Sequence, residues 1–191
     1  MPRKGYLHLT IILLVLALAG TAVADQDLPD SKKTTLGLYA DSRQAYTMWR
    51  NDPVQVAIID CRTPEEYVYV GHAAMAVNIP SKLMTHEFDT QKKSYKMVEN
   101  PDFVAAVKKL FKKEQTLLIM CRSGSRSARS VDMLAQAGYT NVYSITDGFE
   151  GDKVKDENSY FNGQRMVNGW KNSGNPWTYA CDPSLVYAPQ K

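Results

Sequence analysis

The chain has 191 residues, 23 of them basic and 20 acidic, and its formal net charge is only +3. This near balance provides no strongly basic surface, so we expect neither a nucleic-acid partner nor a polybasic membrane contact. The length suits one domain with a well-buried core.

The first 24 residues have the pattern of a secretory signal peptide. A basic start at Arg3 and Lys4 precedes an almost uninterrupted apolar run over residues 9–19, and Ala22-Val23-Ala24 is a small-residue cleavage site. The run is shorter than the ~20 residues that a membrane span needs. We therefore expect cleavage after Ala24, a periplasmic or secreted protein, and no stable membrane span after cleavage. An uncleaved N-terminal anchor is the alternative. Residues 25–35 are polar, and we expect them to form a flexible mature N-terminus.

Apolar runs and amphipathic segments alternate along the next hundred residues. The apolar runs predict strands at 36–40, 54–59, 76–80, 116–120 and 142–145. Capping residues followed by one-sided apolar patterns predict helices at 42–50, from Thr63-Pro64 onward, at 100–113 and at 128–137. The polar stretch 81–96 is expected to be a surface excursion. This alternation predicts an α/β fold, with a central parallel β-sheet flanked by helices on both faces.

The segment Cys121-Arg122-Ser123-Gly124-Ser125-Arg126-Ser127, here called the cysteine loop, joins the strand at 116–120 to the helix that follows. A small-residue loop at a helix N-terminus directs backbone N–H groups toward one point, and the helix dipole adds positive charge. The two arginines add more charge, which favours a thiolate with a lowered pKa. The cysteine loop therefore predicts Cys121 as a nucleophile, with an anionic substrate bound by residues 122–127.

Four segments in order resemble a rhodanese, a sulfurtransferase domain. They are Ile59 to Tyr67, Gly71-His72 with Ala76 to Pro80, the cysteine loop, and Asp147 to Gly151 with Asn168 to Trp177. Two departures stand out: Cys61 replaces an apolar residue that is usual in the family, and residues 152–167 resemble an insertion. The resemblance implies a rhodanese-like domain over 36–180, followed by a C-terminal tail over 181–191.

The resemblance also implies a reaction. Cys121 would take the sulfane sulfur of thiosulfate or of a persulfide donor and pass it, through a Cys121 persulfide, to cyanide or a thiol. Arg126 would aim at the anion in the loop and Arg122 at the thiosulfate oxyanion. Asp60 and Arg62 would support the loop through an ion pair or backbone hydrogen bonds. No cofactor and no metal is implied, and the cysteine and histidine spacings suggest none.

Two other readings compete with sulfur transfer. A cysteine phosphatase or arsenate reductase places five residues between cysteine and arginine, whereas four separate Cys121 from Arg126 and Ser127 occupies the next position. A persulfide carrier or binding module without turnover is the third reading, and the intact cysteine and arginines argue against an inactive copy.

Three cysteines leave at least one thiol outside any internal disulfide. Cys61, at a strand end, is expected to be a buried, inert thiol. The alternative hypothesis is that Cys61 is a resolving thiol for Cys121. Cys181 lies in the loop-rich C-terminal region and is expected to be either free or paired with Cys61.

Overall fold

A computed structural model describes residues 28–188 of the chain. The predicted signal peptide, and the localisation that depends on it, therefore lie outside the described residues. Within the described range, no helix is both long enough and apolar enough to cross a membrane.

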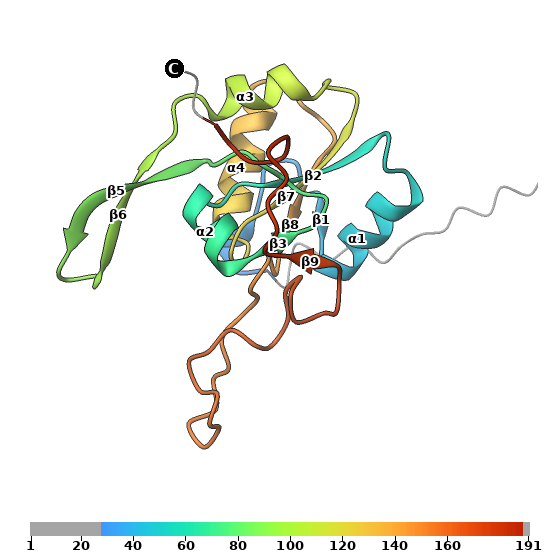
Figure 1. The fold of residues 1–191 in the computed structure, drawn as a ribbon. Helices are drawn as coiled ribbons and strands as arrows, with labels where there is room; N and C mark the ends of the chain where they lie inside the picture. Colours follow the sequence, from blue (N-terminus) through green and yellow to red (C-terminus); the bar gives the residue numbers. More distant parts are fainter. Residues whose placement is uncertain (1–27, 189–191) are drawn as a thin grey trace, which may run out of the picture.

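The centre of the molecule is a five-stranded sheet in which every neighbouring pair is parallel (Figure 1). The spatial order is β1-β8-β7-β2-β4, so β7 is the middle strand, with β8 and β2 beside it. The bounds are Tyr39–Ala40 for β1, Val56–Asp60 for β2, Val77–Asn78 for β4, Thr116–Met120 for β7 and Val142–Ile145 for β8. The predicted parallel α/β sheet is confirmed.

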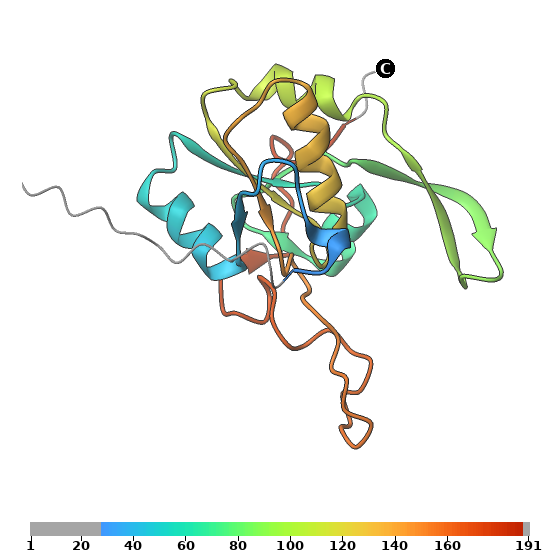
Figure 2. The ribbon, with the colours of Figure 1, turned by 180° about the vertical axis from the view of Figure 1, so that it is seen from behind.

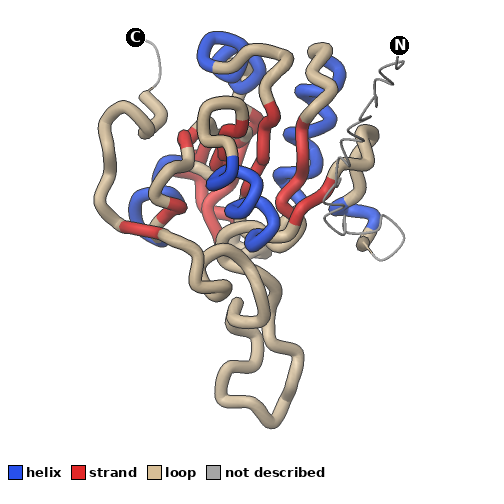
Figure 3. The backbone as a smooth tube through the Cα atoms, turned by 90° about the vertical axis from the view of Figure 1, so that its right-hand side faces the viewer, coloured by secondary structure: helices blue, strands red, loops and turns tan. Residues whose placement is uncertain are grey.

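Helices cover both faces of this sheet, which explains the continuous apolar runs of its central strands. The helices are α1 (Ser42–Asn51), α2 (Pro64–Val70), α3 (Phe103–Leu110) and α4 (Ser125–Gln136). Ile59 and Ile119 pack with α3 and α4, whereas Ile58 and Leu118 pack with α1. Helix α4 lies behind the sheet in Figure 1 and in front of it in Figure 2, and Figure 3 shows the strands gathered at the centre.

Two antiparallel pairs lie outside the main sheet and were not predicted. The stretch expected to be a surface excursion forms a hairpin of β5 (Lys82–Asp89) and β6 (Ser94–Glu99), and every residue of β6 is exposed. The second pair joins β3 (His72–Ala73) to β9 (Trp177–Thr178). The β3–β9 pair ties the C-terminal segment to the chain just after α2. Residues 152–167, in contrast, form a loop that projects from the domain in all three views (Figure 3).

Part of the N-terminal segment that we expected to be flexible contacts the domain. A short 3-10 helix, η2 (Asp30–Lys32), lies against α4. The backbone N–H and the hydroxyl of Thr35 both donate to Asp132 of α4 at 2.8 Å, and Lys32 pairs with Asp152 at 3.2 Å. These polar contacts attach the segment beside the cysteine loop.

Candidate active site

The cysteine loop lies at the carboxyl end of the middle strand, where ligands bind in open parallel sheets. β7 ends at Met120 and α4 begins at Ser125, so the turn between them presents Cys121 at the helix N-terminus. The Cys121 side chain is buried, with 2% of the residue exposed. The backbone N–H of Gly124 donates to its Sγ at 3.1 Å, and those of Ser123 and Ser127 help to lower the pKa of the thiol.

Two glycines allow the neighbouring backbone to pack closely against this turn. Gly124 has a φ of +107°, and a Cβ there would lie 2.2 Å from the carbonyl oxygen of Thr146. Gly148 has a φ of +63°, and a Cβ there would lie 2.6 Å from the carbonyl oxygen of Cys121. The N–H of Phe149 donates to that same Cys121 oxygen at 2.8 Å. The segment after β8 therefore fixes the backbone that directs its N–H groups toward the sulfur.

The surroundings of Cys121 favour the thiolate. Burial alone would raise the pKa of Cys121, but three influences outweigh it and leave that pKa well below its usual value. They are a hydrogen bond from the Cys61 thiol, the positive charge of Arg126, and the backbone N–H groups of the loop. The group predicted as the nucleophile is thus held in its reactive form.

Arg126 acts on the thiolate by its charge, because its guanidinium is bound elsewhere. Its Nη1 and Nη2 each donate to one carboxylate oxygen of Glu66, both at 2.6 Å. The same Glu66 completes a capping box with Thr63 at the start of α2. Burial opposes ionisation of Glu66, yet the ion pair with Arg126 keeps the pKa of Glu66 below its usual value. In the structure the Arg126 guanidinium is paired with Glu66, and its binding of the substrate anion stays a prediction.

Asp60 and Arg62 form a fully buried ion pair behind the loop. Arg62 Nη2 lies 2.6 Å from Asp60 Oδ2 and also donates to the carbonyl oxygen of Gly71 at 2.8 Å. The guanidinium stacks over the Phe149 ring at 4.3 Å from its centroid. Because both side chains are inaccessible, they hold the end of β2, α2 and the segment after β8 together and cannot touch a substrate directly.

The loop serines and Arg122 have different surroundings. Ser127 is buried and its hydroxyl donates to the Gly124 carbonyl oxygen at 2.7 Å, so it braces the turn from inside. Ser123 and Ser125 are partly exposed, and the Ser125 hydroxyl lies 3.4 Å from that of Ser31. Arg122 is exposed at the rim. Of the two loop arginines, Arg122 is the one free to meet an anion that arrives from solvent.

A charged cleft lies next to this rim. Its volume is about 470 Å³, and the projecting loop supplies part of its wall. The charged residues that line it are Glu150, Lys153, Arg165 and Lys171. Glu150 connects the cleft to the rim, because its N–H donates to the Arg122 carbonyl oxygen at 3.0 Å. Burial raises the pKa of Glu150, against the attraction of Arg62 and Arg122.

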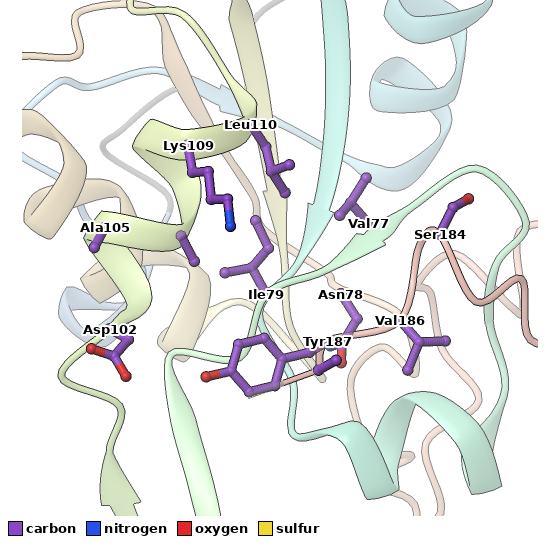
Figure 4. A pocket seen from close by; sticks show the side chains of 12 residues that line it. Val77, Asn78, Ile79, Asp102, Ala105, Lys109, Leu110, Ser184, Val186 and Tyr187 are labelled. Carbon is purple, nitrogen blue, oxygen red and sulfur yellow. The ribbon is translucent and has the colours of Figure 1, made fainter. Parts of the chain in front are cut away.

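A second cavity, of about 380 Å³, lies beside the edge strand β4, between β4, α3 and the C-terminal tail (Figure 4). It has an apolar lining that includes Ile79, Leu110 and Tyr187, and no residue of the cysteine loop lines it. The cavity is therefore separate from the candidate chemistry.

Two supporting carboxylates were missed by the sequence analysis. Glu66 lies in the first turn of the helix predicted from Thr63-Pro64 onward, and the pattern Thr63-x-x-Glu66 indicates its capping role but not its ion pair with Arg126. Asp147 is buried and accepts from the backbone N–H and the hydroxyl of Ser42 at 2.9 and 2.8 Å and from Gly169 N–H at 3.0 Å. Asp147 thereby fixes the segment that presses on the cysteine loop.

A thiolate in a turn of backbone N–H groups, at the end of a parallel strand, defines a cysteine-nucleophile domain of the α/β class. A family model for the rhodanese-like domain matches residues 41–155. The chain belongs to the rhodanese-like domain family, as the sequence resemblance indicated.

Relatives and solved structures agree with this assignment. The chain is 34% identical over 91 residues to thiosulfate sulfurtransferase 16, chloroplastic, of Arabidopsis thaliana, a match that covers 48% of this chain and 68% of the relative. It is 30% identical over 126 residues to thiosulfate sulfurtransferase 18 of that plant, covering 65% and 84%. Several other relatives are covered over less than two thirds of their length. The crystal structure of Rv0390 from M. tuberculosis superimposes with a TM-score of 0.57 and 25% identity, covering 74% of this chain and 99% of that one.

Proposed function

We propose that the protein is a rhodanese-type sulfurtransferase that moves a sulfane sulfur from thiosulfate, or from a persulfide donor, to cyanide or a thiol. The observation that carries the proposal is the buried Cys121 sulfur at the N-terminus of α4, where the N–H of Gly124 donates to it and the surroundings lower its pKa. A small anion-binding turn around the Cys121 sulfur is suited to stabilise the outer sulfur of a Cys121 persulfide.

The reaction proceeds in two steps. The Cys121 thiolate attacks the outer sulfur of thiosulfate, forming an S–S bond as the bond to the sulfonate sulfur breaks and sulfite leaves. The acceptor then attacks the outer sulfur of the persulfide, and the electron pair of that S–S bond returns to Cys121. The step needs no general base, because the surroundings of Cys121 lower its pKa and favour the thiolate.

Arg122 and the neighbouring cleft serve the donor. Arg122 is exposed at the rim, and Lys153, Arg165 and Lys171 supply positive charge to the cleft beside it. An anionic donor is attracted to this region, and Arg122 can pair with the departing sulfite.

Phosphate or arsenate chemistry is less well supported. Both outer nitrogens of Arg126 are used by Glu66, so that guanidinium is unavailable to hold a tetrahedral oxyanion in the turn. The four-residue separation between Cys121 and Arg126 also favours a single sulfur atom.

The direct test is incubation with thiosulfate and cyanide, with thiocyanate as the measured product. Wild type should form thiocyanate repeatedly, and Cys121→Ser should form none above the uncatalysed reaction. Cys181→Ser, which removes the exposed thiol, is the matched control and should retain turnover. Equal thiocyanate from wild type and Cys121→Ser would refute catalysis of this reaction, and a single sulfur transfer without turnover would favour a carrier.

We also propose that the protein acts in the periplasm or outside the cell. The support is the leader-like pattern of residues 1–24. Intact mass of the protein recovered from an exported fraction tests it, since cleavage after Ala24 fixes the expected mature mass.

A further inference from the structure

Cys61 and Cys121 occupy matching positions at the ends of two adjacent parallel strands. Asp60 of β2 pairs in register with Met120 of β7, and the N–H of Cys61 donates to the Met120 carbonyl oxygen at 2.8 Å. Each cysteine is therefore the next residue along its strand. Neighbouring strands lie about 4.8 Å apart, a separation that falls inside the Cα range of about 4.4–6.8 Å found in disulfides.

The two side chains also point the same way. Ile59, Cys61, Ile119 and Cys121 all belong to the apolar cluster on the α3–α4 side of the sheet. The two thiols also influence each other electrostatically, since the adjacent Cys121 raises the pKa of Cys61 and Cys61 lowers that of Cys121. Both side chains therefore lie on one face of adjacent strand ends, a placement that brings the two sulfurs together.

Cys61 has access to the Cys121 sulfur and not to solvent. It is fully buried, whereas Cys181 is exposed and hydrogen-bonded to the Tyr179 carbonyl oxygen. Burial and the adjacent Cys121 raise the pKa of Cys61, so it rests as a protonated thiol while Cys121 is ionised. A buried thiol of this kind attacks slowly, which leaves time for an external acceptor to react first.

We propose that Cys61 is a second catalytic cysteine, which resolves the Cys121 persulfide when no acceptor arrives. Cys61 Sγ attacks Cys121 Sγ, and a Cys61–Cys121 disulfide forms as the bond to the outer sulfur breaks. The outer sulfur takes the electron pair of that bond and, with the proton from Cys61, leaves as hydrogen sulfide. The two cysteine sulfurs are oxidised and the sulfane sulfur is reduced by two electrons, so no external oxidant is needed. This step rests on the proposed function, which supplies the persulfide.

The strand register directs the attack to the inner sulfur, because Cys61 lies beside Cys121 itself on the adjacent strand end. The N–H of Gly124, which donates to Cys121 Sγ, is placed to stabilise the departing sulfide. The protein then releases sulfide once per chain and stops as the disulfide until a dithiol reduces it. The consequence is a second product from thiosulfate and a self-limiting resting state.

The experiment uses fully reduced protein, kept free of oxygen and mixed with thiosulfate without an acceptor. Sulfite, sulfide and intact mass are followed over time, and peptides are mapped without reduction. Wild type should release one sulfite, then one sulfide, and lose two hydrogens in mass through a Cys61–Cys121 bond. Cys61→Val and Cys61→Ala should gain one sulfur atom, keep it, and show complete loss of sulfide release. Cys181→Ser is the matched control and should behave as wild type.

The results of this experiment distinguish failure of the resolving role of Cys61 from failure of the proposed sulfurtransferase function. A wild-type persulfide that persists as long as that of Cys61→Val overturns the resolving role and leaves the proposed function intact. A disulfide that joins Cys121 to Cys181, or two chains to each other, also overturns it. If wild type and both Cys61 variants release no sulfite and gain no sulfur, the proposed function is wrong and this step is wrong with it.

Discussion

Opposite charge changes in the Arg126–Glu66 pair should move the reactivity of Cys121 in opposite directions. Arg126→Gln removes a positive charge near the thiolate, whereas Glu66→Gln removes the negative charge that partly neutralises it. Burial raises the pKa of Cys121, and Arg126 is among the groups that oppose this. At an effective dielectric constant of ~20, a unit charge several Å away is worth about 2 kcal/mol, and partial neutralisation by Glu66 lowers this. We therefore expect the pKa of Cys121 to rise in Arg126→Gln and to fall in Glu66→Gln.

Stability supplies the internal control, because both variants break the same bidentate pair. Its two contacts are 2.6 Å long, and the side chains are only 16% and 12% exposed. Removing one partner of a fully buried pair costs about 3–5 kcal/mol, so each variant should lose roughly 2–3 kcal/mol of unfolding free energy. Urea unfolding measures this loss, and the pH dependence of iodoacetamide alkylation at Cys121 measures the thiol pKa. The reasoning is refuted if the two variants shift that pKa in the same direction, or if neither shifts it.

Three further predictions concern the turn, the rim and acid stability. Gly124→Ala should lower the unfolding free energy measured in urea by about 2–3 kcal/mol, because the new Cβ would lie 2.2 Å from a backbone oxygen. Gly174→Ala is the control, since Gly174 has a φ of +77° and open space around it, and should lose about 1 kcal/mol. Equal losses would contradict the packing argument. Arg122→Ala should raise the KM for thiosulfate about tenfold, as the loss of a contact worth ~1.4 kcal/mol implies. Arg129→Ala, which removes an exposed arginine on α4, should leave the KM unchanged. A reduced kcat with unchanged KM in Arg122→Ala would argue against donor binding. The ion pair lowers the pKa of Glu66 against the effect of burial, so the stabilisation by the pair is complete above about pH 4.3 and is lost as pH falls through the folded-state pKa. In urea titrations, the difference in unfolding free energy between wild type and Glu66→Gln should therefore shrink below about pH 4. A constant difference would contradict this linkage.

The sequence predicts this molecule best where burial is two-sided. The strand at 116–120 has the predicted bounds because an apolar run buried on both faces ends sharply at a small-residue turn. The β5–β6 hairpin was missed for the opposite reason. All residues of β6 are exposed, so no alternation of apolar and polar residues marks the strand.

The site shows the same division. The cysteine loop is a continuous segment, and its chemistry can be recognised from seven residues. The Glu66–Arg126 pair joins residues 60 positions apart, and the attachment of Thr35 to Asp132 joins residues 97 positions apart. Such polar contacts have no apolar periodicity and depend on where the fold brings two chain segments together. A single sequence cannot specify them before the fold is known.

The central claim is that Cys121 accepts the outer sulfur of thiosulfate as a persulfide. Intact mass spectrometry of Cys61→Val after brief exposure to thiosulfate, without an acceptor, tests this most directly, since the variant cannot lose the sulfur internally. The expected result is a gain of one sulfur atom on the peptide that contains Cys121, with one sulfite released per chain. Neither should occur in Cys61→Val with Cys121→Ser added. An unchanged mass in the first variant, or the same gain in both, would contradict the account.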